Sequence, residues 1–547
     1  MAGHDVIPDK SITPLTGAHA LVETLRVHGV DTVFGIPGTH NLPIYQALGQ
    51  AGLRCVTPRH EQGAGYAADG YARVTGRPGV VLTTTGPGVV NAATALAQAY
   101  SDSSPVLLIS TGVPTDHPRD GRGYLHESKD QTRAIGALCA ASHRVGSVRE
   151  IPAAVAGAFA RFAEGRPRPL HIEIPADLLD ARGVARVAPP YRIMPRAPDP
   201  LALDEAARRL GAAARPGIVL GGGAQRPRDA AQPVGRAVMR VAERLGARVV
   251  TTVNGKGTVP ESHRLALGAT LHLGAVRRWL AACDVVLAIG TELGPADLWV
   301  EDFVLGGSLI RVDVDPAQMH GDHVADVAIV ADATLAAEGL RERVERRGVV
   351  PRPREERPDG PGAAMARELA VLARRWRAQT RALRLALPPD TIFVGDNSMI
   401  VYHAALMDIP VDPPGRFLFP AGYGTLGFAL PAAIGAKLGC PDRPVVALAG
   451  DGAFQFTVQE LAMAVQLRLS LPIVVSMNGG FGEIREEMIE RGMTPLAVDL
   501  HCPDLPALAD AYGARGAAVK TPAELQEAVS QALRAPVPTV IAVAEDE

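Results

Sequence analysis

Two short polar segments in the last third of the chain have the residue types of a metal and phosphate site. Gly450-Asp451-Gly452 ends the apolar run PVVALAG, and Asn478 ends a second apolar run, PIVVSMN. Glycines let backbone amides approach a phosphate closely, and carboxylate and amide oxygens are the ligands that Mg²⁺ prefers. An Asp-Gly pair alone is more often an ordinary turn, so the prediction requires both segments to meet at one edge of a sheet.

The elements that would position these residues are strands and helices in regular alternation. The apolar, β-branched runs are DTVFGI (31–36), GVVLTTTG (79–86), PVLLIS (105–110), LHIEIP (170–175), GIVLGGG (217–223), DVVLAIG (284–290), PVVALAG (444–450) and PIVVSMN (472–478). Continuous apolar strands between helices predict an α/β fold with parallel sheets covered on both faces. Linkers rich in Pro and charge at 181–200 and 346–362 predict three doubly wound parallel-sheet domains, at 14–180, 200–345 and 365–545.

The composition excludes several classes of protein. The chain has 55 basic and 58 acidic side chains, a net charge of -3, so it has no bulk field for nucleic acid or an anionic membrane surface. No apolar run approaches the roughly 18 residues of a membrane helix, and the first residues have no apolar core of a secretory signal. The five cysteines form no CxxC pair. We therefore expect neither a zinc site nor disulfides, and a cytoplasmic protein.

The spacing of the two polar segments makes the first prediction specific. Twenty-four residues separate Gly452 from Met477. The whole segment resembles the GDG…NN signature of thiamine-diphosphate (ThDP) enzymes, in the superfamily of acetolactate synthases and 2-oxo acid decarboxylases. It departs from that pattern at Met477, where the family has the first Asn. The resemblance implies ThDP and Mg²⁺ as cofactors, with Asp451, Asn478 and the carbonyl of Gly480 as metal ligands.

Other segments resemble the family's remaining contacts to ThDP. RHEQGAGYAADGYAR (59–73) carries Glu61, where the family has the acid that touches N1′ of the aminopyrimidine; by itself Glu61 reads as a helix N-terminal residue placed for the dipole. Leu426 stands where the family usually has the Met that wedges the cofactor into a V, and the Gly424 carbonyl would accept from the pyrimidine amino group. The expected cofactor-binding residues are Pro37, Glu61, Pro87, Gly395, Asp396, Asn397, Ser398, Gly424, Leu426, Gly450, Asp451, Gly452, Ala453, Asn478 and Gly480.

Two further segments concern the substrate. FGEIREEMIERGMTPLAVDL (481–500) and GRGYLHESKDQ (121–131) resemble 5-guanidino-2-oxopentanoate (2-ketoarginine) decarboxylases, within a resemblance that covers residues 14–545. An acid suits a guanidinium, so the tentative substrate residues are Glu483 and Glu487, with Glu486 a third candidate on the same stretch. The same stretch also has the i,i+4 charge pattern of a solvated helix face. His126 is predicted to be catalytic, as a proton relay; the alternative is a surface loop histidine.

The expected function is thus decarboxylation of a 2-oxo acid, with 4-guanidinobutanal and CO₂ as products. The alternatives are a pyruvate-using carboligase like acetolactate synthase and a non-catalytic structural or regulatory homologue. FAD is not expected, because the flavin-binding pattern of acetolactate synthases is not evident. The family builds its site between chains, which implies a homodimer or homotetramer, and arginine catabolism would fit.

Two features of the middle domain receive a structural interpretation. Gly221-Gly222-Gly223 lacks the full dinucleotide fingerprint, so it is interpreted as the first strand-helix turn of that domain rather than as part of a nucleotide-binding oxidoreductase. The run RVDVDPAQ (311–318) is interpreted as the last strand of the domain.

Overall fold

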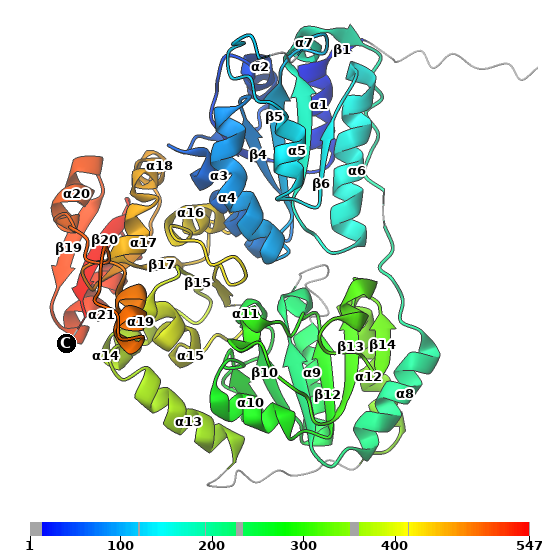
Figure 1. Cartoon of the computed structure of the whole chain (residues 1–547), viewed down its shortest axis with the longest axis vertical. Coiled ribbons are helices and arrows are strands. Elements are labelled where there is room, and N and C mark those ends of the chain that lie inside the picture. Colours follow the sequence, from blue (N-terminus) through cyan, green and yellow to red (C-terminus); the bar gives the residue numbers. More distant parts are fainter. Residues whose placement is uncertain are drawn as a thin grey trace, which may run out of the picture. The chain divides into compact units, whose positions relative to one another are not determined.

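The computed structural model describes residues 14–118, 121–191, 193–225, 234–349, 360–413 and 415–545. These residues form three six-stranded sheets in which every strand pairing is parallel, plus one short antiparallel pair, β1 (Leu15–Thr16) with β8 (Arg182–Gly183) (Figure 1). The predicted α/β fold with three parallel sheets is therefore confirmed.

The chain forms two compact units. One unit comprises the described parts of residues 1–68, 78–100 and 104–193, and the other comprises those of residues 69–77, 101–103 and 194–547. The first sheet lies in the first unit, and the other two sheets lie in the second.

The first sheet has the strand order β3-β2-β4-β5-β7-β6. Its strands are β2 (Thr32–Gly35), β3 (Arg54–Val56), β4 (Gly79–Thr83), β5 (Val106–Gly112), β6 (Ala141–Arg144) and β7 (Leu170–Pro175). The helices are α1 (Gly17–Val27), α2 (Leu42–Ala51), α3 (Glu61–Thr75), α4 (Pro87–Ser101), α5 (Gln131–Gly136), α6 (Ile151–Glu164) and α7 (Ala176–Asp180). Alternate strand residues such as Val80, Leu82 and Ile109 pack against α1, α2 and α6. The intervening residues are buried as well, which explains the continuous apolar runs.

The middle sheet has the strand order β11-β10-β9-β12-β13-β14. Its strands are β9 (Pro216–Leu220), β10 (Arg248–Thr251), β11 (Ala266–Gly268), β12 (Val285–Ile289), β13 (Ser308–Asp313) and β14 (Val327–Val330). The helices are α8 (Pro200–Ala212), α9 (Val234–Leu245), α10 (Gly274–Ala281), α11 (Pro295–Leu298) and α12 (Ala333–Arg346).

The interpretation of residues 311–318 as the last strand of the middle domain is wrong. The strand ends at Asp313, and Asp315 caps a short 3₁₀ helix, Pro316–His320. Proline has no N–H for a strand ladder, so pairing does not continue through Pro316. The last strand is β14, whose four residues at the sheet edge lack the long apolar run that reveals a central strand.

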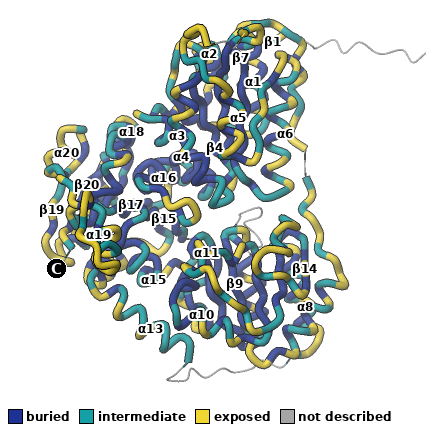
Figure 2. Tube along the Cα trace, viewed as in Figure 1, coloured by how far each residue is buried: buried dark blue, intermediate teal, exposed yellow. Residues whose placement is uncertain are grey.

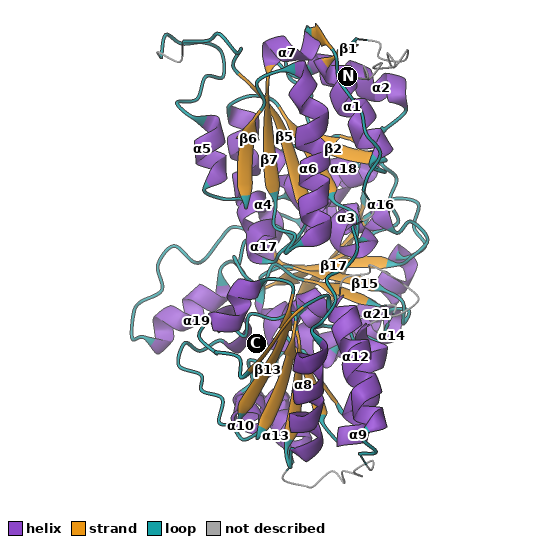
Figure 3. Cartoon of the chain, turned by 90° about the vertical axis from the view of Figure 1, so that its right-hand side faces the viewer, coloured by secondary structure: helices purple, strands orange, loops and turns teal. Residues whose placement is uncertain are grey.

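The third sheet has the strand order β16-β15-β17-β18-β20-β19. Its neighbouring strands β15 and β17 can be seen in Figure 3. Its strands are β15 (Ile392–Gly395), β16 (Arg416–Leu418), β17 (Val445–Gly450), β18 (Pro472–Met477), β19 (Arg515–Val519) and β20 (Thr539–Ala544). The helices are α13 (Pro361–Leu372), α14 (Arg377–Ala386), α15 (Leu406–Asp408), α16 (Ala429–Gly439), α17 (Asp451–Gln455), α18 (Leu461–Gln466), α19 (Gly482–Glu490), α20 (Leu505–Tyr512) and α21 (Pro522–Ala532). Strands β15, β17 and β18 are direct neighbours, so their carboxyl ends share one edge.

Burial follows the same layering in each part (Figure 2). The strands of the three sheets are mostly buried, whereas α19 presents mainly exposed and half-buried residues. Among the described residues, no helix combines the length and the apolar character needed to cross a membrane.

Candidate cofactor and substrate site

Asp451 begins α17, directly after β17, and is only 1% exposed. Its Oδ1 accepts a hydrogen bond from the amide of Gly452 at 2.9 Å, and its Oδ2 accepts one from the amide of Gly479 at 2.8 Å. The positive end of the helix also favours a negative charge at this position. The carboxylate therefore connects the ends of β17 and β18 at one edge of the sheet.

The other two predicted metal ligands lie at the same sheet edge. Oδ1 of Asn478 is 3.3 Å from the amide nitrogen of Gly480, which donates to it. The carbonyl oxygen of Gly480 lies 3.1 Å from the position that a Cβ on Gly452 would occupy. The described residues contain no cluster of three or more His, Cys, Asp or Glu side chains suited to a metal. One carboxylate, one amide and one carbonyl fit a hard cation such as Mg²⁺ whose remaining ligands are phosphate oxygens.

The loop after β15 positions both neighbouring segments. Ser398 Oγ accepts a hydrogen bond from the amide of Gly450 at 2.7 Å. The buried carboxylate of Asp396 accepts from the amides of Gly427 at 3.0 Å and Ala429 at 2.8 Å, and burial raises its pKa to about 6. Asn397 donates to the carbonyls of Pro420 at 3.1 Å and Thr425 at 2.9 Å. The side chains of Asp396 and Asn397 thus hold the loop that carries Gly424 and Leu426.

A second anchor for that loop comes from the motif around residues 59–73. Arg73 forms ion pairs with Asp69 at 2.7 Å and Asp102 at 2.6 Å, and it donates to the carbonyl of Phe419 at 3.1 Å. Asp102 in turn accepts from the amide of Gly422 at 2.9 Å. Sequence reasoning gave Asp69 and Arg73 no separate role, because the further partners of Arg73, Asp102 and Phe419, lie 29 and 346 residues away in the chain.

In the first unit, Glu61 is the first residue of α3 and is 8% exposed. Its Oε2 accepts a hydrogen bond from Asn91 at 2.9 Å, and its Oε1 lies 3.0 Å from the position of a Cβ on Gly88. Gly38 packs equally closely on Thr84. The loops that carry Pro37 and Pro87 therefore meet beside Glu61. Asn91 was missed, since its only signal is its place one turn into α4.

His126 lies in the loop before α5 and has a left-handed backbone, φ 64°. The carbonyl oxygen of His126 lies so close to Gly86 that a Cβ would not fit there. His126 therefore adjoins the turn that carries Pro87. Its ring centroid is 5.2 Å from that of His40, and neither Nδ1 atom has a hydrogen-bond partner among the described residues. Burial, with His126 nearby, lowers the pKa of His40. Sequence reasoning missed His40, which has no motif signal of its own.

The same turn is fixed from behind by a buried polar chain. Gln131 accepts a hydrogen bond from the Gly86 amide at 2.8 Å and donates to Ser110 Oγ at 3.0 Å. His171 is 1% exposed, and its two ring nitrogens lie 2.8 Å from Ser110 Oγ and 2.7 Å from Ser142 Oγ. Burial lowers the pKa of His171 to about 3.

This buried imidazole predicts an acid-sensitive first unit. In the unfolded chain the imidazole of His171 binds a proton near pH 6.5, whereas in the folded protein its pKa is about 3. The contribution of neutral His171 to the free energy of unfolding is therefore complete above pH 6.5 and is lost as the pH falls toward 3. Between pH 7 and pH 5 the loss is expected to be about 2 kcal/mol in the free energy of unfolding. Urea unfolding of wild type and His171→Gln at both pH values measures it. The slope should persist in His143→Gln, which changes an exposed histidine in the same unit.

The three candidate substrate acids all lie on α19 and differ in their partners. Glu483 is 3.0 Å from Nε2 of His403 and also bonds the Tyr402 hydroxyl; the bond to His403 is the main cause that lowers its pKa. Glu486 pairs with Arg375 at 3.0 Å, and Glu487 pairs with Arg491 one turn along the helix. Gly482, beside Glu483, packs directly on Asn478. Of the three acids, Glu483 adjoins the predicted metal ligands.

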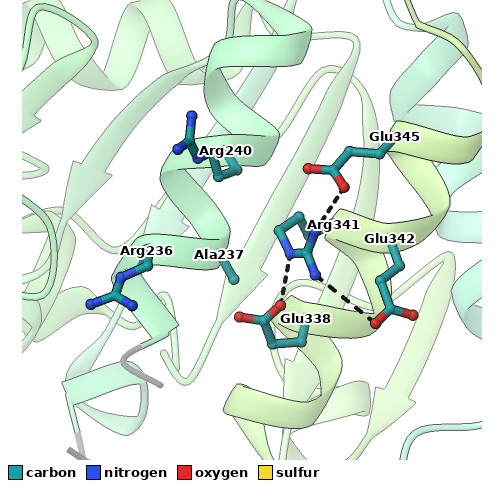
Figure 4. Close-up of a pocket in the computed structure, with 7 residues that line it drawn as sticks. All are labelled: Arg236, Ala237, Arg240, Glu338, Arg341, Glu342 and Glu345. Carbon is teal, nitrogen blue, oxygen red and sulfur yellow. Dashed lines mark hydrogen bonds and ion pairs between the residues drawn. The ribbon is translucent and has the colours of Figure 1, made fainter. Parts of the chain in front are cut away.

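A pocket elsewhere contains none of these residues (Figure 4). It lies between α9 and α12 of the middle sheet, where Arg341 pairs with Glu338 and Glu345 at 2.7 Å each and approaches Glu342 at 3.9 Å. Its lining residues are Arg236, Ala237, Arg240, Glu338, Arg341, Glu342 and Glu345. The acids of α12 thus share one cationic partner, Arg341. The residues that line this pocket do not resemble a cofactor site.

Comparison with known families decides the identity of this arrangement. Three models of the thiamine pyrophosphate enzymes match the chain: the N-terminal TPP binding domain at residues 15–134, the central domain at 203–340 and the C-terminal TPP binding domain at 394–543. The chain belongs to the thiamine pyrophosphate enzyme family. The resemblance noted in the sequence is confirmed, and the protein is a ThDP-dependent enzyme of the group that acts on 2-oxo acids.

Curated relatives align over nearly the whole chain. A probable 2-ketoarginine decarboxylase of Pseudomonas aeruginosa is 41% identical over 537 residues, which cover 95% of this chain and 92% of the relative. An acetolactate synthase of Mycobacterium bovis is 33% identical over 566 residues, covering 95% and 86%. The large subunit of acetolactate synthase isozyme 3 of Escherichia coli is 31% identical over 548 residues, covering 95% and 92%.

Proposed function

We propose that this ThDP enzyme, with Mg²⁺ bound, decarboxylates 5-guanidino-2-oxopentanoate to 4-guanidinobutanal and CO₂. The observation that carries the proposal is the carboxylate of Glu483, three residues beyond Gly480 and kept anionic by His403 and Tyr402. A fixed anion beside the cofactor-binding edge suits a substrate whose far end is a cation. The 41% identity to a probable 2-ketoarginine decarboxylase supports the same choice.

In this proposal the third sheet holds the charged end of the cofactor. Asp451, Asn478 and the Gly480 carbonyl would hold Mg²⁺, while the backbone of 395–398, the glycines flanking Asp451 and Ala453 would bind the diphosphate. Leu426 would pack against the cofactor, and the Gly424 carbonyl would accept a hydrogen bond from it. When bound, the thiazolium would supply the electron sink that decarboxylation of a 2-oxo acid requires.

The first unit supplies the acid–base groups. Glu61, oriented by Asn91, holds or releases a proton at N1′ of the aminopyrimidine, while Pro37 and Pro87 border that ring. The overall reaction takes up one proton at the carbon that loses CO₂. His126, beside the Gly86 turn and close to His40, is the residue we assign to that proton transfer.

The proposal extends to the assembly and the setting. The family typically builds its site between chains, so we propose a homodimer or homotetramer whose sites combine Glu61 of one chain with Asp451 of another. The five free cysteines suit a reducing cytoplasm, and the substrate suits arginine catabolism.

A carboligase is the second candidate, because acetolactate synthases align over 95% of the chain. In that case pyruvate would be preferred, and a second 2-oxo acid would take the place of the proton. Purified protein with ThDP and Mg²⁺ separates the two functions. CO₂ release is compared between 5-guanidino-2-oxopentanoate and pyruvate, and the products are identified by mass. A guanidino aldehyde supports the decarboxylase, whereas a joined product from pyruvate overturns it.

Replacing Glu483 with Gln is expected to weaken guanidinium recognition. Loss of a charge-assisted hydrogen bond corresponds to roughly a 10- to 100-fold drop in the preference for the guanidino acid over neutral 2-oxohexanoate, measured as a ratio of kcat/KM values. Glu490→Gln, an exposed acid on the same helix, should leave the ratio as in wild type. An unchanged ratio in Glu483→Gln with a fall in Glu487→Gln would transfer the role to Glu487.

A further inference from the structure

Trp299 combines an exposed ring with an irregular backbone. It follows α11 with a left-handed conformation, φ 55°, and remains 44% exposed. A bulky residue rarely adopts this region, and such outliers concentrate at functional sites. One face of the indole stacks on the buried ring of His272, with centroids 4.2 Å apart and planes at 27°. Burial lowers the pKa of His272 to about 3, so the supporting ring is neutral.

The two residues of the third sheet domain that contact Trp299 also lie on an irregular stretch of backbone. Tyr402 and His403 lie on a single turn of π-helix, Val401–Ala405, that follows the loop of Ser398. The planes of both adjacent rings are steeply inclined to the indole, with centroids at 6.1 Å and an angle of 77° for Tyr402 and at 6.3 Å and 82° for His403. Single π turns occur frequently at functional sites, and this one presents two consecutive side chains to one ring.

Glu483 completes this group of side chains. The carboxylate binds the hydroxyl of Tyr402 and Nε2 of His403, and 47% of its side chain stays exposed. His403 is supported from behind by Trp376, stacked at 5.8 Å and 18°. Burial raises the pKa of Tyr402, which therefore remains a neutral donor. One partly exposed anion thus adjoins a partly exposed aromatic group.

A guanidinium is the ligand chemistry that matches this arrangement. It is planar, its N–H groups pair with a carboxylate, and its faces stack on aromatic rings, with Trp the strongest partner. We propose that Trp299 and Tyr402 form the aromatic surface that holds the substrate guanidinium against Glu483. The inference rests on the proposed function and deepens it, because it assigns substrate selection partly to the middle sheet domain.

Two segments of this proposed site each follow a predicted cofactor-binding residue closely in the sequence. Tyr402 is four residues beyond Ser398, and Glu483 is three residues beyond Gly480. The Sδ atom of Met399 lies 4.0 Å from the side-chain amide nitrogen of Asn478, so the two segments are in contact where each begins. The proposal therefore places the keto acid of the substrate at the cofactor and its guanidinium at Glu483.

The test compares the guanidino acid with 5-ureido-2-oxopentanoate, a neutral analogue of nearly the same shape. In Trp299→Leu the kcat/KM preference for the guanidino acid over the ureido acid is expected to fall about 5- to 30-fold, the range of a cation–π contact. Trp299→Phe should retain most of the preference. Tyr191→Leu, which removes an exposed aromatic ring far along the sequence, should behave as wild type.

A binding measurement makes the outcome independent of turnover. The chain has three tryptophans, so 4-guanidinobutanoate, which has no keto group to react, should quench part of the wild-type fluorescence and much less in Trp299→Phe. If wild type prefers the guanidino acid and Trp299→Leu keeps that preference, the aromatic site is wrong and the proposed function stands. If wild type prefers pyruvate, the proposed function itself fails.

Discussion

Glu61→Gln is expected to lower kcat for decarboxylation by about 10²- to 10⁴-fold, the usual contribution of a positioned acid or base. Gln keeps the length of the side chain and an oxygen that can accept the 2.9 Å hydrogen bond from Asn91. What it loses is the ability to hold and release a proton at the aminopyrimidine. The fold and the close packing against Gly88 should therefore persist, and the loss should appear in kcat rather than in ThDP binding.

Single-turnover CO₂ release at saturating ThDP measures this loss, and ThDP affinity is measured separately by tryptophan fluorescence. Glu164→Gln, an exposed acid in the same unit, is the matched control and should retain wild-type rates. Asn91→Ala should give a smaller loss, because it removes only the group that orients Glu61. A Glu61→Gln enzyme within tenfold of wild type would contradict the role of Glu61.

Asp451→Asn is expected to raise the apparent Kd for Mg²⁺ at least about 100-fold, because even residues behind a metal ligand commonly change affinity 10- to 100-fold. The substitution keeps an oxygen that can accept from Gly452 or Gly479, so the junction between β17 and β18 should survive. It removes the charge that a hard cation requires. Because Mg²⁺ and the diphosphate would be held at the same sheet edge, ThDP retention should fall together with metal affinity.

Equilibrium dialysis of ThDP against an Mg²⁺ series gives both quantities without relying on activity. Asp510→Asn, at an exposed position of the same sheet domain, serves as the control. Thermal unfolding of the ligand-free variant checks that its fold is kept. Unaltered Mg²⁺ dependence in a folded Asp451→Asn protein would place the metal elsewhere.

Much of the architecture could be predicted because parallel strands buried on both faces are continuous apolar runs. The same logic led to the proposed metal and diphosphate residues, since strand ends of one sheet converge at one edge. It failed for β14, a four-residue edge strand. After Asp451 the structure has α17, a 3₁₀ turn at Val458–Glu460 and α18. Thr457 in this segment bonds the carbonyl of Gly427 at 2.8 Å, a contact that no local pattern reveals.

The sequence by itself therefore determined the fold class and the family and indicated the short motifs proposed for the cofactor site, because each is written in consecutive residues. Only the tertiary structure decided which acids have which partners: Glu486 and Glu487 pair with arginines, while Glu483 meets Tyr402 and His403. It alone brought Asn91 to Glu61 and Trp299 to Tyr402. Apart from the Glu487–Arg491 pair within α19, these contacts join residues tens to hundreds of positions apart, and side-chain packing between elements, rather than local periodicity, sets them.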